Sequence, residues 1–286
     1  MLIIYSRIYV SFFCTFSLGV NILRDYQQAI KMKLLSIFIL IAVLFENKLE
    51  AFESTNLLGN DKGLNEKLIK LIEKFKDYLR KGNESFGLPV MDPFTIKHQE
   101  LPMKSELFSG EVKINNLQLL GLSNYNVVKA DLKIVGLKLM LALHWPGLNL
   151  IINNYEIDGV ALKFIDVYGK GSLKMNLNSL NFTTTVSVST NKSNKTLFIK
   201  EMNSEVSLED FQFLIDGLFN DKDLSDMTNA IVSDLVPSII KTYQKKLTST
   251  INNLVITRAN EILRTMTLKD ILGLINSSHQ NQNFLL

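Results

Sequence analysis

Residues 128–134 read Val-Lys-Ala-Asp-Leu-Lys-Ile, an alternation of apolar and polar residues with a period of two. Successive side chains of a β-strand point to opposite faces, so this pattern predicts a strand with one buried and one solvated face. The same alternation occurs in residues 111–115 and 137–139. It is typical of an antiparallel sheet, and it decides the fold class.

Strand-like segments continue from Glu106 to about Thr190. As one strand, residues 128–143 would extend about 50 Å, more than ordinary sheets allow, so we expect this strand to coil or bend at Gly136. Asn153-Asn154 tolerates positive φ and is predicted to form a tight hairpin. The predicted strands are 128–143, 155–167, 171–177, 182–189 and 197–206, with turn residues at Gly121, Gly136, Pro146-Gly147 and Asn153-Asn154.

A helical period precedes the strands. Residues 64–80 place large apolar side chains at spacings of three and four among charged ones, which predicts an amphipathic helix that ends at Gly82. Pro89 and Pro93 then impose an extended conformation on residues 88–94.

After Leu208 the helical period returns. Residues 224–226 supply an N-cap for a helix that runs to about Leu235, and Pro237 is compatible with the first turn of a second helix over 238–264. That second helix would be about 40 Å long. We therefore predict two helices separated by the proline.

The order of elements predicts one α+β domain. No break between residues 64 and 273 has the composition of a linker. A long C-terminal helix wrapped by a strongly curved antiparallel sheet, with a shorter N-terminal amphipathic helix, satisfies these patterns. We assign residues 52–275 to this domain and residues 276–286 to a polar tail.

The N-terminus is predicted to be a targeting segment. Two lysines, the 12-residue apolar run 34–45 and a small residue at Ala51 describe a secretory signal peptide over residues 32–51. We interpret residues 1–31 as an over-extended gene model, with a signal anchor as the alternative. The protein is then secreted and extracellular, and it loses its single cysteine, Cys14, with the leader.

Composition and motifs argue against several classes of function. With 31 basic and 28 acidic residues, the chain lacks the strong basic bias of nucleic-acid binders. One cysteine and three scattered histidines predict no intramolecular disulfide, no metal site and no cofactor. No nucleophile elbow, P-loop or zinc-protease motif is present, so we expect no enzyme. His144 and Asp92 are expected to be structural, and Gly169-x-Gly171 is expected to be a bend in the sheet.

Five Asn-x-Ser/Thr triplets are candidate glycosylation sites in a secreted chain. The stretch 191–196 has the composition of an exposed turn and is the best of them. The candidate asparagines are Asn83, Asn181, Asn191, Asn194 and Asn276.

The order of several landmarks resembles the takeout and juvenile-hormone-binding protein family of arthropods. Each landmark is weak alone, but together they cover roughly residues 64–273. They are Leu88-Pro89, Asp92-Pro93, Gly121-Leu122-Ser123, Tyr125, Val127-Val128, Pro146, Tyr155-x-x-x-Gly159, Gly169-x-Gly171, Leu218-Phe219, Leu224 and Pro237.

This resemblance implies a secreted, monomeric carrier of a small hydrophobic ligand, such as a juvenile-hormone-like terpenoid, a fatty acid or another lipid. It also implies a cysteine pair near the first helix, which residues 64–80 lack. We therefore hypothesise that this helix acts as a mobile gate. The alternative function is a secreted interaction protein of the same fold with a filled core, which docks lipid-presenting or receptor partners.

Large apolar residues are candidates for the wall of the ligand site, and Tyr243 can offer a hydroxyl to a polar ligand end. Lys241, Lys245 and Lys246 form a solvated helix face or a contact for acidic lipid or a protein partner. If the lysines form such a contact, we expect the protein to bind a membrane or a receptor transiently. The candidate wall residues are Phe108, Trp145, Phe164, Phe213, Ile240, Tyr243, Leu247 and Ile251.

Overall fold

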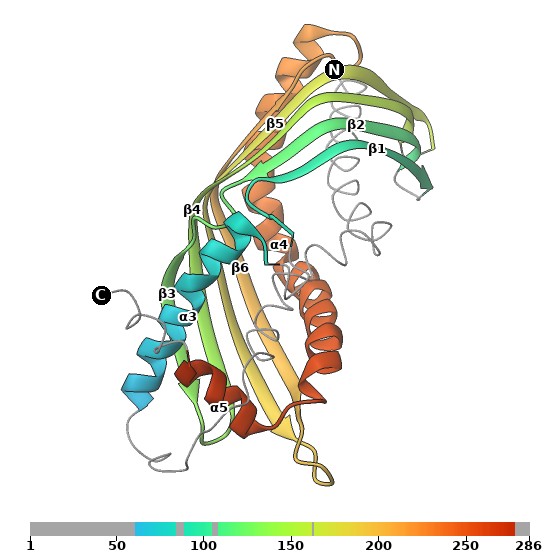
Figure 1. Ribbon diagram of the computed structural model, residues 1–286. Helices are drawn as coiled ribbons and strands as arrows, with labels where there is room; N and C mark the ends of the chain where they lie inside the picture. Colours follow the sequence, from blue (N-terminus) through green and yellow to red (C-terminus); the bar gives the residue numbers. More distant parts are fainter. Residues whose placement is uncertain (1–60, 84–88, 105–107, 162, 278–286) are drawn as a thin grey trace, which may run out of the picture.

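A strongly bent antiparallel sheet with a long helix along one edge forms the body of the protein (Figure 1). The computed structural model describes residues 61–83, 89–104, 108–161 and 163–277. The sheet order is β1-β2-β4-β5-β6, and β3 pairs with the other half of β4. The elements are α3 (Asp61–Lys81), β1 (Phe94–Lys104), β2 (Phe108–Leu120), β3 (Asn126–Lys133), β4 (Lys138–Ala161), β5 (Ile165–Thr190), β6 (Leu197–Ile215), α4 (Lys222–Leu263) and α5 (Leu268–Ser277). The predicted fold class is confirmed.

The three long strands β4, β5 and β6 connect two halves of the sheet. At one end, residues 149–161 of β4 pair with β2, and we call this end the β1–β2 half. At the other end, residues 138–144 of β4 pair with β3, and we call this end the β3 half. The predicted signal peptide, the preceding residues 1–31, Cys14, and the tail from residue 278 lie outside the described residues.

Pro146-Gly147 does not turn the chain, and 171–177 and 182–189 are not separate strands. β4 and β5 run through both places with their pairing register intact. The alternation of inward-facing and outward-facing side chains shifts by one residue here. Leu177 and Leu180 are three residues apart on β5, yet both pack against the same core cluster. Ser179, between them, has a φ of 54°. The sequence pattern breaks here because the sheet bends, not because the strand ends.

The predicted hairpin at Asn153-Asn154 is wrong as well, whereas the predicted turns at Gly121 and Gly136 are confirmed. Asn153-Asn154 lies inside β4, where the register with β5 shifts between Ile152 and Tyr155, so the extra residue forms a bulge and not a hairpin. The chain reverses instead at residues 134–137, where Gly136 has a φ of 88°. The predicted strand 128–143 is therefore two strands, β3 and β4.

α4 is one helix of 42 residues with Pro237 inside it, so the predicted division into two helices is wrong. An interior proline removes one helical hydrogen bond and costs about 3 kcal/mol. Polar side chains anchor the helix to the edge strand β6 on both sides of the proline, and these anchors offset the loss. Asn229 pairs with the N–H (2.7 Å) and C=O (3.2 Å) of Ile215, and Asn260 pairs in the same way with Ile199.

α3 confirms the predicted amphipathic helix and packs its apolar side on β3 and β4 through Leu68 and Phe75. Polar contacts hold its two ends. At the start, Asn65 accepts a hydrogen bond from the N–H of Leu132 (2.8 Å). At the end, the guanidinium of Arg80 donates to the hydroxyl of Ser123 (3.0 Å).

Candidate functional site

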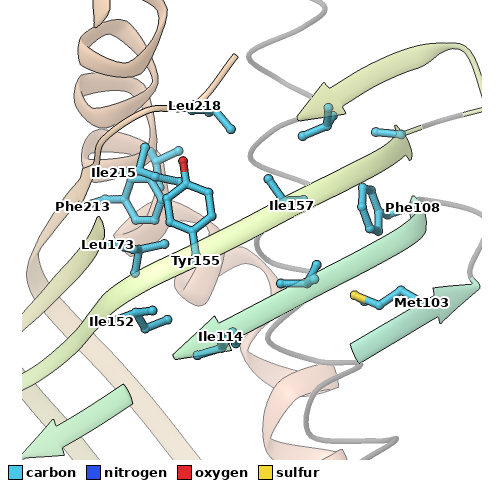
Figure 2. Close-up of a cluster of buried hydrophobic side chains, with 14 of the residues drawn as sticks. Met103, Phe108, Ile114, Ile152, Tyr155, Ile157, Leu173, Phe213, Ile215 and Leu218 are labelled. Atoms are coloured by element: carbon cyan, nitrogen blue, oxygen red, sulfur yellow. The ribbon is translucent and has the colours of Figure 1, made fainter. Parts of the chain in front are cut away.

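The β1–β2 half of the sheet has a closed hydrophobic core (Figure 2). Phe108 and Phe213 are 0% and 1% exposed, and they belong to the same cluster as Tyr155 and Ile157. The hydroxyl of Tyr155 donates a hydrogen bond to the backbone carbonyl of Asp216 (2.8 Å). Burial, together with the nearby Asp216 carboxylate, raises the pKa of this tyrosine. These residues form well-packed core.

Gly169 and Gly171 allow the segment between β6 and α4 to pack directly on this part of the sheet. A Cβ on Gly169 would lie 2.5 Å from the carbonyl oxygen of Gly217, and one on Gly171 would collide with the carbonyl oxygen of Asp216. The backbone of β5 therefore approaches the segment after β6 at van der Waals distance. Both glycines lie in the sheet, paired with Ile157 and Tyr155 of β4, and their role is this close approach; the expected bend stays a prediction.

In the β3 half, α3 and α4 lie on the same face of the sheet. Leu141 of β4 packs against α3 and pairs with Thr184, which in turn pairs with Ser204 of β6. The hydroxyl of Ser204 bonds to Asn252 of α4 (2.6 Å). Directly paired residues share a face, so one face carries both helices, α3 over β3 and β4 and α4 over β6. In Figure 1, α3 lies toward the β3 edge of the strands and α4 toward the β6 edge.

Between the two helices lies a row of apolar side chains that are only partly buried. We call it the central strip, and it begins at the bend of the sheet. Its members pack against four different core clusters, and all of them stay partly exposed. The central strip consists of Leu143, Leu177, Leu180 and Phe182.

A polar group interrupts the apolar face beside the central strip. The hydroxyl of Ser204 lies 2.8 Å from the hydroxyl of Thr184 and 2.6 Å from the Asn252 side-chain oxygen. Thr184 is 5% exposed and Asn252 is 8% exposed, so both are buried polar side chains on the inner face. Sequence reasoning missed this group because its three members come from β5, β6 and α4.

The structure does not bring the eight predicted wall residues together. Phe108, Phe213 and Ile240 meet in the closed core of the β1–β2 half. Trp145 adjoins the central strip instead: it pairs with Leu180 across β4 and β5, shares a cluster with Leu143, and donates its indole N–H to the carbonyl of Leu122 (3.0 Å).

Three of the remaining candidates are exposed. Phe164 is 72% exposed because it follows the turn between β4 and β5, so it does not line the interior. Tyr243 is 47% exposed and Ile251 is 37% exposed, and both lie on α4. Leu247, on the same helix, is half-buried.

The two residues expected to be structural have structural partners. His144 contacts the side-chain oxygen of Asn181 across the β4–β5 pair at 2.9 Å. Asp92 accepts hydrogen bonds from the backbone N–H groups of Gly121 (2.9 Å) and Ser123 (2.8 Å). Within the described residues, no helix is long and apolar enough to cross a membrane.

The candidate glycosylation sites differ in accessibility. Asn191 and Asn194 are exposed in the turn between β5 and β6, and each side-chain oxygen accepts a hydrogen bond from the hydroxyl two residues on, Ser193 or Thr196. Asn181 lies inside β5 and is partly buried, which is a poor position for glycosylation. Asn83 and Asn276 stay as predictions.

Comparisons with known proteins give the family. Takeout 1 from Epiphyas postvittana is 15% identical with a TM-score of 0.49, over 71% of this chain and 93% of that chain. A lipopolysaccharide binding protein is 12% identical with a TM-score of 0.30, over 75% of this chain and 40% of that chain. No curated protein sequence matches the chain.

The family model described as haemolymph juvenile hormone binding protein matches residues 34–273, which is well over half of the chain. The match includes the Asp92-Pro93 and Gly121-Leu122-Ser123 landmarks, which the structure brings into direct contact. The chain therefore belongs to the haemolymph juvenile hormone binding protein family.

Proposed function

We propose that the protein is a secreted carrier that binds one small hydrophobic ligand against the central strip, between α3 and α4. The ligand class is a juvenile-hormone-like terpenoid, a fatty acid or another lipid. The observation that carries this proposal is the central strip itself, because apolar side chains on the inner face of a well-formed core are normally covered. The family match supports the same class of function.

The closed core limits where a ligand can lie. Phe108 and Phe213 are fully buried inside the β1–β2 half, and Leu177 and Leu180 are among the partly buried apolar residues at its boundary. Ligand bound there would extend along Phe182 into the β3 half. The half-buried Leu247 of α4 is a candidate for the opposite side.

The buried polar group supplies a second element of recognition. An ester, epoxide or carboxyl at one end of the ligand can exchange hydrogen bonds with Thr184, Ser204 or Asn252, while the chain lies on the central strip. Such a combination of apolar lining and few polar groups is typical of small-molecule sites. We propose it in place of Tyr243 as the partner of the polar ligand end.

The size of the ligand sets the expected affinity. Burying about 400 Å² of apolar ligand surface contributes roughly 10 kcal/mol at about 25 cal/mol per Å². The loss of translational and rotational freedom offsets part of this, so dissociation constants from micromolar to nanomolar are expected.

Displacement of a fluorescent fatty acid or terpenoid tests the site. Leu180→Asp places a charge on the central strip and should weaken probe binding at least about tenfold, because the carboxylate would lose hydration on binding. The matched control is Leu214→Asp, since Leu214 is 51% exposed on β6. Phe182→Ala serves as a milder second variant. Equal probe affinity of the folded Leu180→Asp, Phe182→Ala and Leu214→Asp proteins would refute the proposed position of the ligand.

A further inference from the structure

The side of α4 that faces the sheet changes along the helix. Val232 is buried in the core of the β1–β2 half, and Val255 is buried in the cluster of the β3 half. At about 100° per residue, these two contacts lie about 140° apart around the helix. The residues between the two contacts therefore turn from one half of the sheet to the other, and those at 241–243 and 245–246 are exposed.

An apolar row runs along this middle segment without a partner in the described structure. Tyr243, Ile251 and Leu254 are 47%, 37% and 38% exposed. They fall within an arc of about 80° on the helix surface. We call these three residues the α4 row.

The charges beside the α4 row have one sign. From Val236 to Asn260 the chain contains no Asp or Glu, while Lys241, Lys245 and Lys246 are exposed there. Lys241 and Lys246 lie on opposite sides of the α4 row, each about a third of a turn away from it, whereas Lys245 lies on the far side of the helix. Among the described contacts, none of the three lysines forms an ion pair.

We propose that the α4 row docks on an anionic lipid surface, where the carrier takes up or releases its ligand. The argument is charge complementarity combined with apolar exposure: aromatic and aliphatic side chains can enter the interface while flanking lysines contact acidic headgroups. The proposal rests on the proposed carrier function, because it names the surface through which ligand is exchanged.

The arrangement also explains why docking and ligand binding use separate residues. The central strip lies on β4 and β5, whereas the α4 row lies on the exposed side of α4. Changes in the lysines should therefore alter transfer between protein and membrane without altering the affinity for dissolved ligand.

Co-sedimentation of the full secreted chain with vesicles tests the proposal. Binding to phosphatidylcholine vesicles that contain phosphatidylserine should exceed binding to pure phosphatidylcholine vesicles and should fall with added salt. The double variant Lys241→Gln, Lys246→Gln should lose at least about tenfold in vesicle affinity. The matched control, Lys129→Gln with Lys170→Gln, changes lysines that are exposed on strands and should keep full binding.

A second pair of variants tests the apolar contribution. Tyr243→Ser with Ile251→Ser should weaken vesicle binding, whereas Val128→Ser with Leu214→Ser, which are exposed on strands, should not. The affinity for a dissolved fluorescent fatty acid is measured in parallel and should stay unchanged. Vesicle binding that is insensitive to the lysines, equal on neutral vesicles, or undetectable would overturn the docking surface.

The two proposals fail in different ways. Loss of dissolved-probe affinity in the Tyr243→Ser, Ile251→Ser protein would make the α4 row part of the ligand wall and would overturn docking. No probe binding by the wild-type protein would instead refute the carrier function.

Discussion

Asp92 and Ser123 join two distant segments: the carboxylate of Asp92 accepts hydrogen bonds from both the backbone N–H and the hydroxyl of Ser123. Asp92 precedes β1, and Ser123 lies in the turn between β2 and β3. Ser123 is fully buried and also accepts the hydrogen bond from Arg80 of α3. A single carboxylate thus fixes the turn on which the end of α3 rests.

Replacing Asp92 with alanine should destabilise the protein strongly. The N–H groups of Gly121 and Ser123 would lose their acceptor, and each unsatisfied buried donor costs about 1–3 kcal/mol. We expect a total loss of about 2–5 kcal/mol in the free energy of unfolding, measured by urea denaturation. Asp166→Ala, at an exposed position of β5, should change it little. A similar small loss for both variants would show that the Asp92 contacts are unimportant.

Asn260 should matter in the same way for the edge of the sheet. Its amide satisfies both the N–H and the C=O of Ile199 on β6, an edge strand whose backbone would otherwise lack a partner. Asn260→Ala should cost about 1–3 kcal/mol. Asn253→Ala, at an exposed position of the same helix, is the matched control and should cost under about 0.5 kcal/mol.

Stability should decrease at alkaline pH. The pKa of Tyr125 and the pKa of Tyr155 are both raised, chiefly because burial disfavours the phenolate. The folded state therefore keeps the proton more tightly than the unfolded state, whose tyrosines titrate near pH ~10. The contribution of these two tyrosines to the free energy of unfolding is complete below that pH and is lost as the pH rises above it.

Urea denaturation of Tyr155→Phe between neutral pH and strongly alkaline pH checks this expectation. The variant should lose about 1 kcal/mol at neutral pH with the hydrogen bond to Asp216, but its stability should decline less steeply above pH ~10. Parallel curves for the two proteins would contradict the assignment.

Periodicity identified most elements as helix or strand, whereas the residues at which they begin and end are determined by tertiary contacts. The period-two pattern predicted antiparallel strands correctly, but Pro146-Gly147 and Asn153-Asn154 carry turn residues without forming turns. Both lie in β4, where the sheet bends or bulges and the pairing to neighbouring strands holds the chain extended. Pro237 likewise stays helical because Asn229 and Asn260 anchor α4 on either side of it.

The site was harder to predict because local sequence does not reveal burial. The apolar spacing on the last helix was read correctly, yet Tyr243 and Ile251 are exposed because they lie on the side of α4 that is turned away from the sheet. Nothing in the sequence distinguished Leu180 and Phe182 from core residues, because half-buried and fully buried inward-facing residues follow the same apolar alternation. Only the placement of α3 and α4 distinguishes them.

The hypothesis that α3 is a mobile gate is tested by hydrogen exchange. Asn65 and Arg80 tie the two ends of the helix to the sheet and its turns, and the hydroxyl of Tyr125 donates to the carbonyl of Ile72 in the middle (2.6 Å). We therefore expect the amides of residues 68–79 to be as protected as those of α4. Exchange of this helix well before α4 would support a gate.

The most direct test of the carrier function is native mass spectrometry of the protein as purified from a secreting insect-cell culture. The account predicts an added mass corresponding to one bound lipid or terpenoid, which is lost or much reduced in Leu180→Asp and retained in Leu214→Asp. A wild-type protein that carries no ligand and takes up none on addition of fatty acid or terpenoid would contradict it.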